Sequence, residues 1–465
     1  MNIKMKTNRY FLLVFSLLII LSSCSTMKQL RADYQPQPIN ERSILRKSTL
    51  DRLSMAHLSE DTTCLMHWQQ FYKDILLQRL IREALVHNSD MEIARLRIQE
   101  AAASLKGVRG LLQPTVNIST GGTVNSFKGE KPAATYSLGP AASWEVDIFN
   151  RKGNNIKAAA ASVDEKKAYA KAVEIQLIAT VARSYYTLEM LDAKKEVTEK
   201  TIHSWQQQIN TERALMAAGE TDNSSILQAE ASKLAAEALL PQIQQQTVAT
   251  ENSLCALLGR PSESIPRNEF FPTALSSSLI NHIPVVALAT RPDVRQAEAQ
   301  LRQAFYQTQV ARSAFYPSLN LSGNAGWTNN GSVGVTNPGS VIWQATASLL
   351  QPLLANGQNK MNLEIAKSEQ QQALVNFRQK VLDAGNEVNN ALNSVQYSEK
   401  IIALQEQQRE KLHQTIHAAE AQMRYGEGNS LQILIARQSL LDAEITLLNS
   451  QYDLIESYIS LFQAL

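Results

Sequence analysis

Few side chains in this sequence are spaced as a catalytic or metal site requires. His413 and His417 stand one helical turn apart, and two histidines at this spacing can hold a metal ion. The chain contains an internal repeat, however, and the corresponding positions of the other copy are Gln206 and Asn210. We therefore interpret this face as a solvated polar surface and expect no metal. The sequence has no Gly-rich phosphate loop, HExxH, GxSxG or CxxC motif, so it predicts neither an enzyme nor a cofactor site.

Cys24 is the residue with the most defined chemistry. Residues 1–23 are typical of a signal peptide, because basic residues precede an apolar run over 10–21 that is too short for a comfortable membrane span. Residues 21–24 (Leu-Ser-Ser-Cys) resemble a bacterial lipobox, whose cysteine becomes the acylated mature N-terminus. Serine at position 25 favours sorting to the outer membrane. A plain secretory signal with a chance cysteine is the alternative interpretation.

Composition excludes several functional classes. The chain has 45 Lys+Arg against 43 Asp+Glu and a formal net charge of +2, whereas nucleic-acid binding requires a basic surface. Glycine (18 residues) and aromatic residues (6%) are scarce, which indicates long helices. Mean hydropathy is −0.22, and after the signal no apolar run reaches the ~20 residues of a spanning helix. Export would permit a disulfide between Cys64 and Cys255, but we expect two free thiols.

The chain consists of two copies of one unit. A shift of 203 residues aligns 85–90 with 288–293 and continues without gaps for roughly 38 residues, and a second block aligns at a shift of 207. We expect a signal peptide (1–23), a lipid-anchored extension (24–66), a first repeat (67–259), a linker (260–284) and a second repeat (285–465).

Each copy is predicted to contain a helix, two strands and a long helical hairpin. A single helix is expected over roughly 74–110, and residues 115–119 then alternate apolar and polar side chains, as strands do. The hairpins carry apolar residues at 3/4 spacing, and 153–217 and 360–425 lack proline. A helix of that length would reach ~100 Å, which no compact domain needs. Residues 260–292 contain five prolines and are predicted to be irregular.

Four strands with one apolar and one polar face cannot close a barrel alone. Unpaired backbone groups are not tolerated in hydrocarbon, and the smallest membrane barrels have ~8 strands. Several chains must therefore share one barrel: two would give 8 strands filled by side chains, and three would give 12 and a channel. Trp144, Trp327 and Trp343 suit an aromatic girdle at the membrane interface. A soluble sandwich with an aromatic core is the alternative.

Several short patterns occur in order along the mature chain: Trp68, Phe71 and Asp74; Trp144 to Phe149; Arg291-Pro292-Asp293-Val294 with Ala297-Glu298; and Phe315 to Leu319. In these the chain resembles the TolC-like outer membrane factors, specifically the lipoprotein branch that serves RND-type pumps. The resemblance implies a mainly α-helical homotrimer, in which a 12-stranded β-barrel in the outer membrane continues as a periplasmic α-helical barrel. It also implies passive export, driven by an inner-membrane RND-type pump through a periplasmic adaptor.

The resemblance places the gate and the adaptor contact at the periplasmic ends of the hairpins. Many relatives carry acidic residues on the helix that leaves the second turn, but here the matching positions are Gln432 and Ile435. We therefore expect a neutral constriction formed by these two residues and Leu434, with no acidic ring. The glycines permit the turns, and two glutamates place charge there. The expected turn residues are Gly219, Glu220, Gly426, Glu427 and Gly428.

Two other functions remain open at this stage. The first is an outer membrane channel for type I protein secretion. The second is a periplasmic coiled-coil adaptor or scaffold without a pore, which the alternating Asn/Ser strands disfavour because such a protein has no membrane strands. The lipobox favours small-molecule efflux by analogy only.

Overall fold

The computed structural model describes residues 29–39, 44, 68–125, 133–219, 222–270, 287–328, 340–352, 356–425 and 430–464. Its elements are α4 (Trp68–Phe71), α5 (Ile75–His87), α6 (Ser89–Gly110), β1 (Thr115–Asn125), β2 (Ala133–Val146), α7 (Arg151–Ala217), α8 (Asn223–Leu257), α9 (Ala287–Thr290), α10 (Pro292–Ser313), β3 (Ser318–Thr328), β4 (Ser340–Leu350), α11 (Gln358–Arg424) and α12 (Ser430–Ala464). Among the described residues, no helix is long and apolar enough to cross a membrane.

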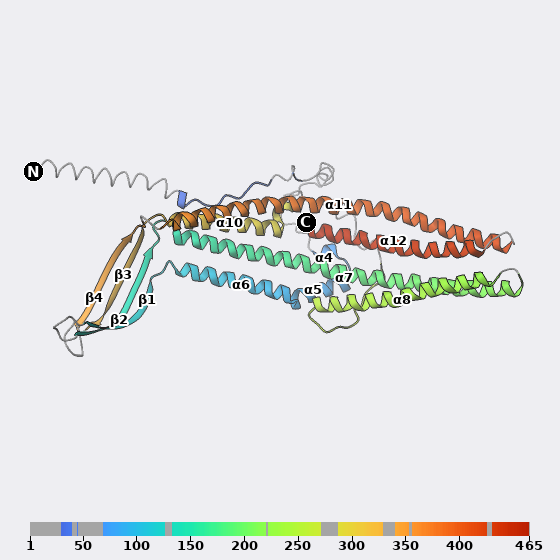
Figure 1. The fold of residues 1–465 in the computed structure, drawn as a ribbon, viewed down its shortest axis with the longest axis horizontal. Helices are drawn as coiled ribbons and strands as arrows, with labels where there is room; N and C mark the ends of the chain where they lie inside the picture. Colours follow the sequence, from blue (N-terminus) through green and yellow to red (C-terminus); the bar gives the residue numbers. More distant parts are fainter. Residues whose placement is uncertain are drawn as a thin grey trace, which may run out of the picture. The chain divides into compact units, whose positions relative to one another are not determined.

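The duplication is visible in the lengths of the elements. Helices α7 and α11 have 67 residues each, and α8 and α12 have 35 each. The helices that precede the strands, α6 and α10, both have 22 residues, and strands β1 and β3 both have 11. The predicted helix–strand–strand–hairpin order therefore occurs in both copies (Figure 1).

The chain divides into two units, each assembled from both copies. Unit 1 comprises Met1–Pro38, Leu96–Ala168 and Arg295–Gln379, and it contains the sheet. Unit 2 comprises Ile39–Arg95, Tyr169–Val294 and Lys380–Leu465, and it contains the hairpin ends.

In unit 1 the four strands form one antiparallel sheet in the order β1-β2-β3-β4 (Figure 1). The central pair, β2 and β3, joins the two copies, with Leu138 opposite Trp327 and Trp144 opposite Leu321. Strands β1 and β4 each have a single neighbour among the described strands, so both outer edges of the sheet are unpaired.

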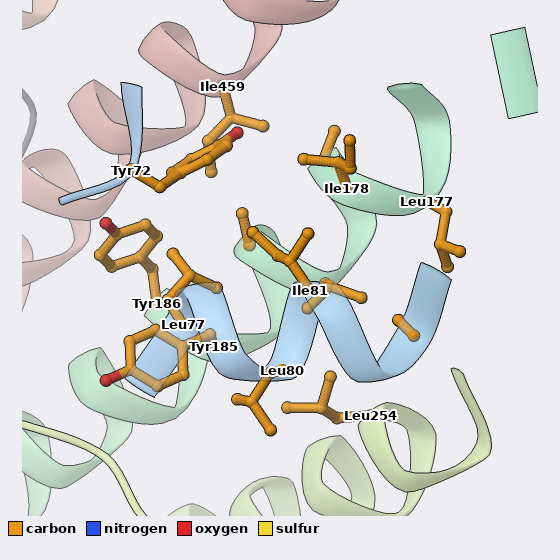
Figure 2. Close-up of a cluster of buried hydrophobic side chains, with 14 of the residues drawn as sticks. Tyr72, Leu77, Leu80, Ile81, Leu177, Ile178, Tyr185, Tyr186, Leu254 and Ile459 are labelled. Carbon is orange, nitrogen blue, oxygen red and sulfur yellow. The ribbon is translucent and has the colours of Figure 1, made fainter. Parts of the chain in front are cut away.

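A cluster of aromatic and aliphatic side chains from α5, α7, α8 and α12 forms the core of unit 2 (Figure 2). Helix α5 contributes apolar residues at 3/4 spacing, including Leu77, Ile81 and Ala84, each fully buried. Tyr185 of α7 and Leu254 of α8 cover this stripe. Burying a side chain of Leu or Ile size contributes roughly 1.5–3 kcal/mol, so this cluster fixes the short helix onto the hairpin helices.

The single helix expected over roughly 74–110 is two helices, because Asn88 interrupts it. Its backbone is extended (φ −69°, ψ 131°), and its side-chain oxygen accepts hydrogen bonds from the amides of Asp90 (2.9 Å) and Met91 (3.2 Å). Asn88 thus caps the N-terminus of α6, as Asp74 caps α5. The apolar periodicity continues across this break, which is why the sequence pattern did not reveal it.

Residues in the left-handed region precede both long helices. Asn150 has φ 57° and Asn356 has φ 48°. Asparagine tolerates this conformation better than other non-glycine residues. The first repeat uses the single residue Asn150, whereas in the second Gly357 (φ 77°) occupies the equivalent position and Asn356 precedes it.

Candidate functional site: the two-faced sheet and the hairpin ends

One face of the sheet is apolar along all four strands. The strand register places Val116 beside Ala142, Trp144 beside Leu321 and Leu321 beside Ala347, so these side chains share a face. Most of its large residues are exposed. We call this set the apolar face: Val116, Ile118, Leu138, Trp144, Leu319, Leu321, Trp327, Val341, Trp343 and Leu349. A soluble sheet would bury such a surface, and in unit 1 nothing described covers it.

The opposite face is lined by small and neutral polar side chains. Glu145 is the one charged residue on it among the described strand side chains, and it is paired with Arg151 (2.6 Å) and Lys152 (3.7 Å) from the start of α7. The polar face comprises Thr115, Asn117, Ser119, Ser137, Ser143, Glu145, Ser318, Asn320, Ser322, Asn324, Gln344, Thr346 and Ser348. This alternation agrees with the pattern expected from the sequence.

The first hairpin turn follows α7. Gly219 has φ 78°, which favours glycine, and its amide donates to the carbonyl of Met216 (3.0 Å). Asp222 then caps α8 by accepting from the amides of Ser224 and Ser225. Glu220 and the second turn, with Gly426, Glu427 and Gly428, lie outside the described residues.

The three residues expected at the constriction differ in burial. Gln432 and Ile435 are exposed at the start of α12, whereas Leu434 is buried against Trp205 and Leu441. Leu434 therefore packs against its own chain, and the constriction expected from the three residues stays a prediction. The two helix starts are joined by a hydrogen bond between the hydroxyls of Ser430 and Ser225 (3.0 Å).

The sequence analysis did not predict a set of hydrogen bonds that joins α12 to α7 and α11 near the hairpin ends. The guanidinium of Arg437 on α12 donates to Glu420 on α11 (2.8 Å) and to the carbonyl of Ser204 on α7 (3.1 Å), and it also bonds the Ser204 hydroxyl. Trp205, which follows Ser204 in the chain, is fully buried in a cluster with Leu434 and Leu441. An arginine and a tryptophan among otherwise aliphatic and small polar heptad positions were the available signal.

Arg291 joins three helices where the second repeat begins. Its guanidinium donates to the carbonyl of Ala464 at the end of α12 (2.6 Å), to Glu387 of α11 (2.5 Å) and to Asp293 of α10 (2.9 Å). At the equivalent position of the first repeat, Asn88 donates to the carbonyl of Leu257 at the end of α8 (3.1 Å). Both copies thus use a polar side chain to hold the C-terminal end of a hairpin helix.

A buried carboxylate lies among the tyrosines of unit 2. Glu189 on α7 is 3% exposed. Desolvation is the main cause that raises its pKa to about 8, and Asp74 and Asp192 raise it further, whereas Tyr185 and Arg267 act in the opposite direction. Arg267 in turn holds Asp192 (2.9 Å) and so connects the segment after α8 to α7.

The described part of the N-terminal extension packs on unit 1. Leu30 is buried, and its carbonyl accepts a hydrogen bond from Asn154 near the start of α7 (2.9 Å). The Tyr34 amide donates to the Tyr306 hydroxyl of α10 (3.3 Å). Of the cysteines, Cys255 is a buried free thiol, whereas Cys24 and Cys64 lie outside the described residues.

A two-faced sheet with unpaired edges, combined with long helical hairpins, is the architecture of an outer membrane channel subunit. The model of the outer membrane efflux protein family matches residues 80–260 and 283–465, and the chain belongs to this family. The TolC-like membership, the fold class and the outer membrane location expected from the sequence are thereby confirmed, as is the function of an outer membrane efflux channel.

Similar proteins cover nearly the whole chain. The probable outer membrane lipoprotein SilC of Salmonella typhimurium is 28% identical over 463 residues, and the cation efflux system protein CusC of Escherichia coli K12 is 28% identical over 467 residues, with 98% of each chain covered in both cases. A crystal structure of CusC superposes with a TM-score of 0.83 at 26% identity, covering 93% of this chain and 98% of that one. The open-state MtrE channel of Neisseria gonorrhoeae gives 0.75 at 27% identity, covering 88% and 93%.

Proposed function

We propose that this protein is the outer membrane exit duct of a tripartite efflux pump, in which three copies share one 12-stranded barrel. The observation that carries the proposal is the two-faced sheet with two unpaired edges. Each edge leaves backbone donors and acceptors that lipid cannot satisfy, so β1 of one copy must pair with β4 of another. The apolar face then contacts lipid, and the polar face lines the lumen.

Twelve strands are favoured over eight by the polar face. Neutral hydrogen-bonding side chains such as Asn320, Asn324 and Gln344 suit a water-filled lumen, whereas a closed eight-stranded barrel packs its interior with side chains. The protein itself acts as a passive channel. Energy and choice of cargo come from an inner-membrane RND-type pump, reached through a periplasmic adaptor that meets the hairpin ends.

Two neighbouring residues on β4 provide the test of this arrangement. Ala345 lies on the apolar face and Gln344 on the polar face. Arginine on the lipid face of a barrel costs about 2–4 kcal/mol at mid-membrane, so Ala345→Arg should greatly reduce membrane-inserted trimer. Gln344→Arg, the matched control, should assemble normally. Native mass spectrometry in detergent measures both. Equal behaviour of the two variants, or a monomeric native protein, would refute the proposal.

We also propose that the Cys24 thiol carries the lipid anchor. Five residues lie between Cys24 and Leu30, whose carbonyl bonds Asn154 near the start of α7, and an extended chain of that length spans at most roughly 20 Å. Trp144, Trp327 and Trp343, all exposed on the apolar face, form the proposed interfacial girdle.

A further inference from the structure

Two short connections lead from helices into the sheet of unit 1, one in each repeat. Residues 111–114 join α6 to β1, and residues 314–317 join α10 to β3. Both connections lie at the end of the sheet where α7 and α11 begin (Figure 1). In the proposed channel this end of the sheet is the boundary between the outer membrane and the periplasm.

Equivalent hydrogen bonds hold the two connections. The Lys152 ammonium of α7 donates to the carbonyl of Leu111 (2.7 Å). At the same position of the second repeat, the Asn359 amide of α11 donates to the carbonyl of Ala314 (3.1 Å). The two connections therefore present their side chains from matching positions.

Each connection combines a basic side chain with a large apolar one. Arg109 and Arg312 stand in the last turns of α6 and α10. Three residues further on come Leu112 and Phe315, which are 43% and 39% exposed, and Leu111 is 51% exposed. Apolar groups left exposed beside an arginine, in both repeats, suit a boundary between hydrocarbon and water. We call Arg109, Leu111, Leu112, Arg312 and Phe315 the collar.

The collar continues the apolar face of the sheet. The indole nitrogen of Trp144, which lies on the apolar face, donates to the carbonyl of Leu112 (2.8 Å). In the second repeat Tyr316, which follows Phe315 in the chain, stacks on Phe149 beyond the end of β2, with ring centroids 5.0 Å apart. The apolar face contacts hydrocarbon in the proposed channel, so the collar lies at the level of the phospholipid headgroups.

The arginines of the collar form no ion pair with any described residue. The carboxylates at the end of β2 are already engaged, because Glu145 pairs with Arg151 (2.6 Å) and Asp147 accepts from the amide of Gly153 (2.7 Å). The last seven residues of α6 and of α10 contain three basic side chains and no acidic one, in a chain that is almost balanced overall. A helix C-terminus favours basic residues, which explains the charge but not the exposed apolar groups beside it.

We propose that the collar binds the phosphate groups of anionic phospholipids in the periplasmic leaflet of the outer membrane. A guanidinium can donate two parallel hydrogen bonds to one phosphate and is weakly hydrated, so it suits the headgroup layer. The leucines and the phenylalanine beside it then enter the acyl chains. A free phosphate ion would satisfy the arginines but would leave these apolar side chains in water. Charge complementarity, together with continuity with the apolar face, therefore selects a lipid.

The inference rests on the proposed channel, which places the sheet in the membrane, and it adds the class of lipid. Each copy brings two collar arginines to the membrane surface. Since one basic residue near an anionic surface strengthens attachment about five-fold, the collar should make the trimer prefer anionic over zwitterionic lipid.

Native mass spectrometry of the purified trimer, titrated with phosphatidylglycerol or phosphatidylcholine, tests this preference. Arg109→Gln with Arg312→Gln should weaken phosphatidylglycerol binding about five-fold per site and remove the preference, whereas lysine at both positions should retain it. Arg79→Gln with Arg378→Gln is the matched control, because both arginines are exposed and form no ion pair with a described residue. Arg378 lies 20 residues beyond Gln358, roughly 30 Å along α11, and the control should bind phosphatidylglycerol like the native protein.

The outcomes separate the collar from the channel. A native trimer that binds both lipids equally, or a double glutamine variant that binds like the native protein, would overturn the collar and leave the channel proposal standing. Displacement of phosphatidylglycerol by millimolar inorganic phosphate would show a site for the free ion and would overturn the lipid assignment. A native protein that forms no trimer would overturn the channel and the collar together.

Depth-dependent quenching tests the apolar part of the collar. Leu112→Cys and Phe315→Cys, in a Cys64→Ser background that keeps the buried Cys255, are labelled with bimane and reconstituted with nitroxide-labelled phospholipids. A nitroxide near the headgroup should quench both sites more strongly than one near the end of the acyl chain. Val86→Cys on α5, where the native side chain is 63% exposed, is the control and should not be quenched. Collar sites as unquenched as Val86→Cys, in protein that still conducts, would overturn the proposal.

Discussion

At the scale of single residues, Glu189 makes stability depend on pH. Its pKa is about 8 in the folded chain against an ordinary value of 4.5, so between these pH values the folded state holds a proton that the unfolded state has lost. The free energy of unfolding should therefore fall as pH rises from 5 to 8, by at most roughly 1.4 kcal/mol per pH unit. Glu189→Gln should remove this slope. Thermal melts followed by circular dichroism at pH 5, 6.5 and 8 measure it, and parallel slopes for both proteins would contradict the prediction.

Arg291 and Asn88 hold equivalent helix ends with very different chemistry. Replacing Arg291 by glutamine removes a buried cation whose partners Asp293 and Glu387 are 33% and 57% exposed, so the cost is that of its hydrogen bonds to charged groups, about 1.5–3 kcal/mol. Asn88→Ala removes a helix cap and should cost about 1 kcal/mol. Urea unfolding of the two variants compares them, with a larger loss expected for Arg291→Gln. If Arg291→Gln lowered the free energy of unfolding less than Asn88→Ala does, the Arg291 guanidinium would contribute no more to stability than a helix cap.

At the scale of elements, the β2–β3 pair depends on two glycines. A Cβ on Gly139 would collide with the carbonyl oxygen of Ala325, and one on Gly326 with that of Leu138. Gly139→Ala and Gly326→Ala should therefore separate β2 from β3, the strands that join the two repeats within one chain. We expect both variants to lose the heat-stable trimer on gels. Gly121→Ala is the control, because its Cβ would meet only the Ser137 hydroxyl at 3.6 Å. Normal assembly of Gly139→Ala would show that the strands can move apart at little cost.

Periodicity allowed most elements to be predicted from the sequence, and its limits explain the errors. The alternation of Leu319, Leu321 and Trp327 with polar residues identified both faces of the sheet, because side-chain direction in a strand has period two. The break at Asn88 was missed because the apolar stripe continues through it. The role of Arg437 could not be predicted, since its partners Glu420 and Ser204 lie 17 and 233 residues away. Arg291 has one near partner in Asp293, but the helices that it joins through Glu387 and Ala464 lie 96 and 173 residues away.

At the scale of the whole molecule, the lipid and the barrel anchor the protein independently. Cys24→Ala should abolish incorporation of radiolabelled palmitate. Because the shared barrel also holds the protein, part of the variant should still fractionate with the outer membrane. Label remaining in the variant would exclude Cys24 as the acylated residue, and complete loss from the membrane would show that insertion requires the lipid.

Closure of the duct is expected where the hairpin ends of three copies converge, and Gln432 is exposed there without a charge. Gln432→Arg would bring like charges together, which repel by ~1 kcal/mol or more per pair at a few Å, so conductance in planar bilayers should rise. The increase should shrink at high salt through screening, and Gln432→Leu, which adds no charge, should show no salt-dependent increase. Gln432→Asp should introduce a block by divalent cations that the native channel lacks. Unchanged conductance in Gln432→Arg would place the constriction elsewhere, and a native channel already blocked by divalent cations would reveal carboxylates at the opening.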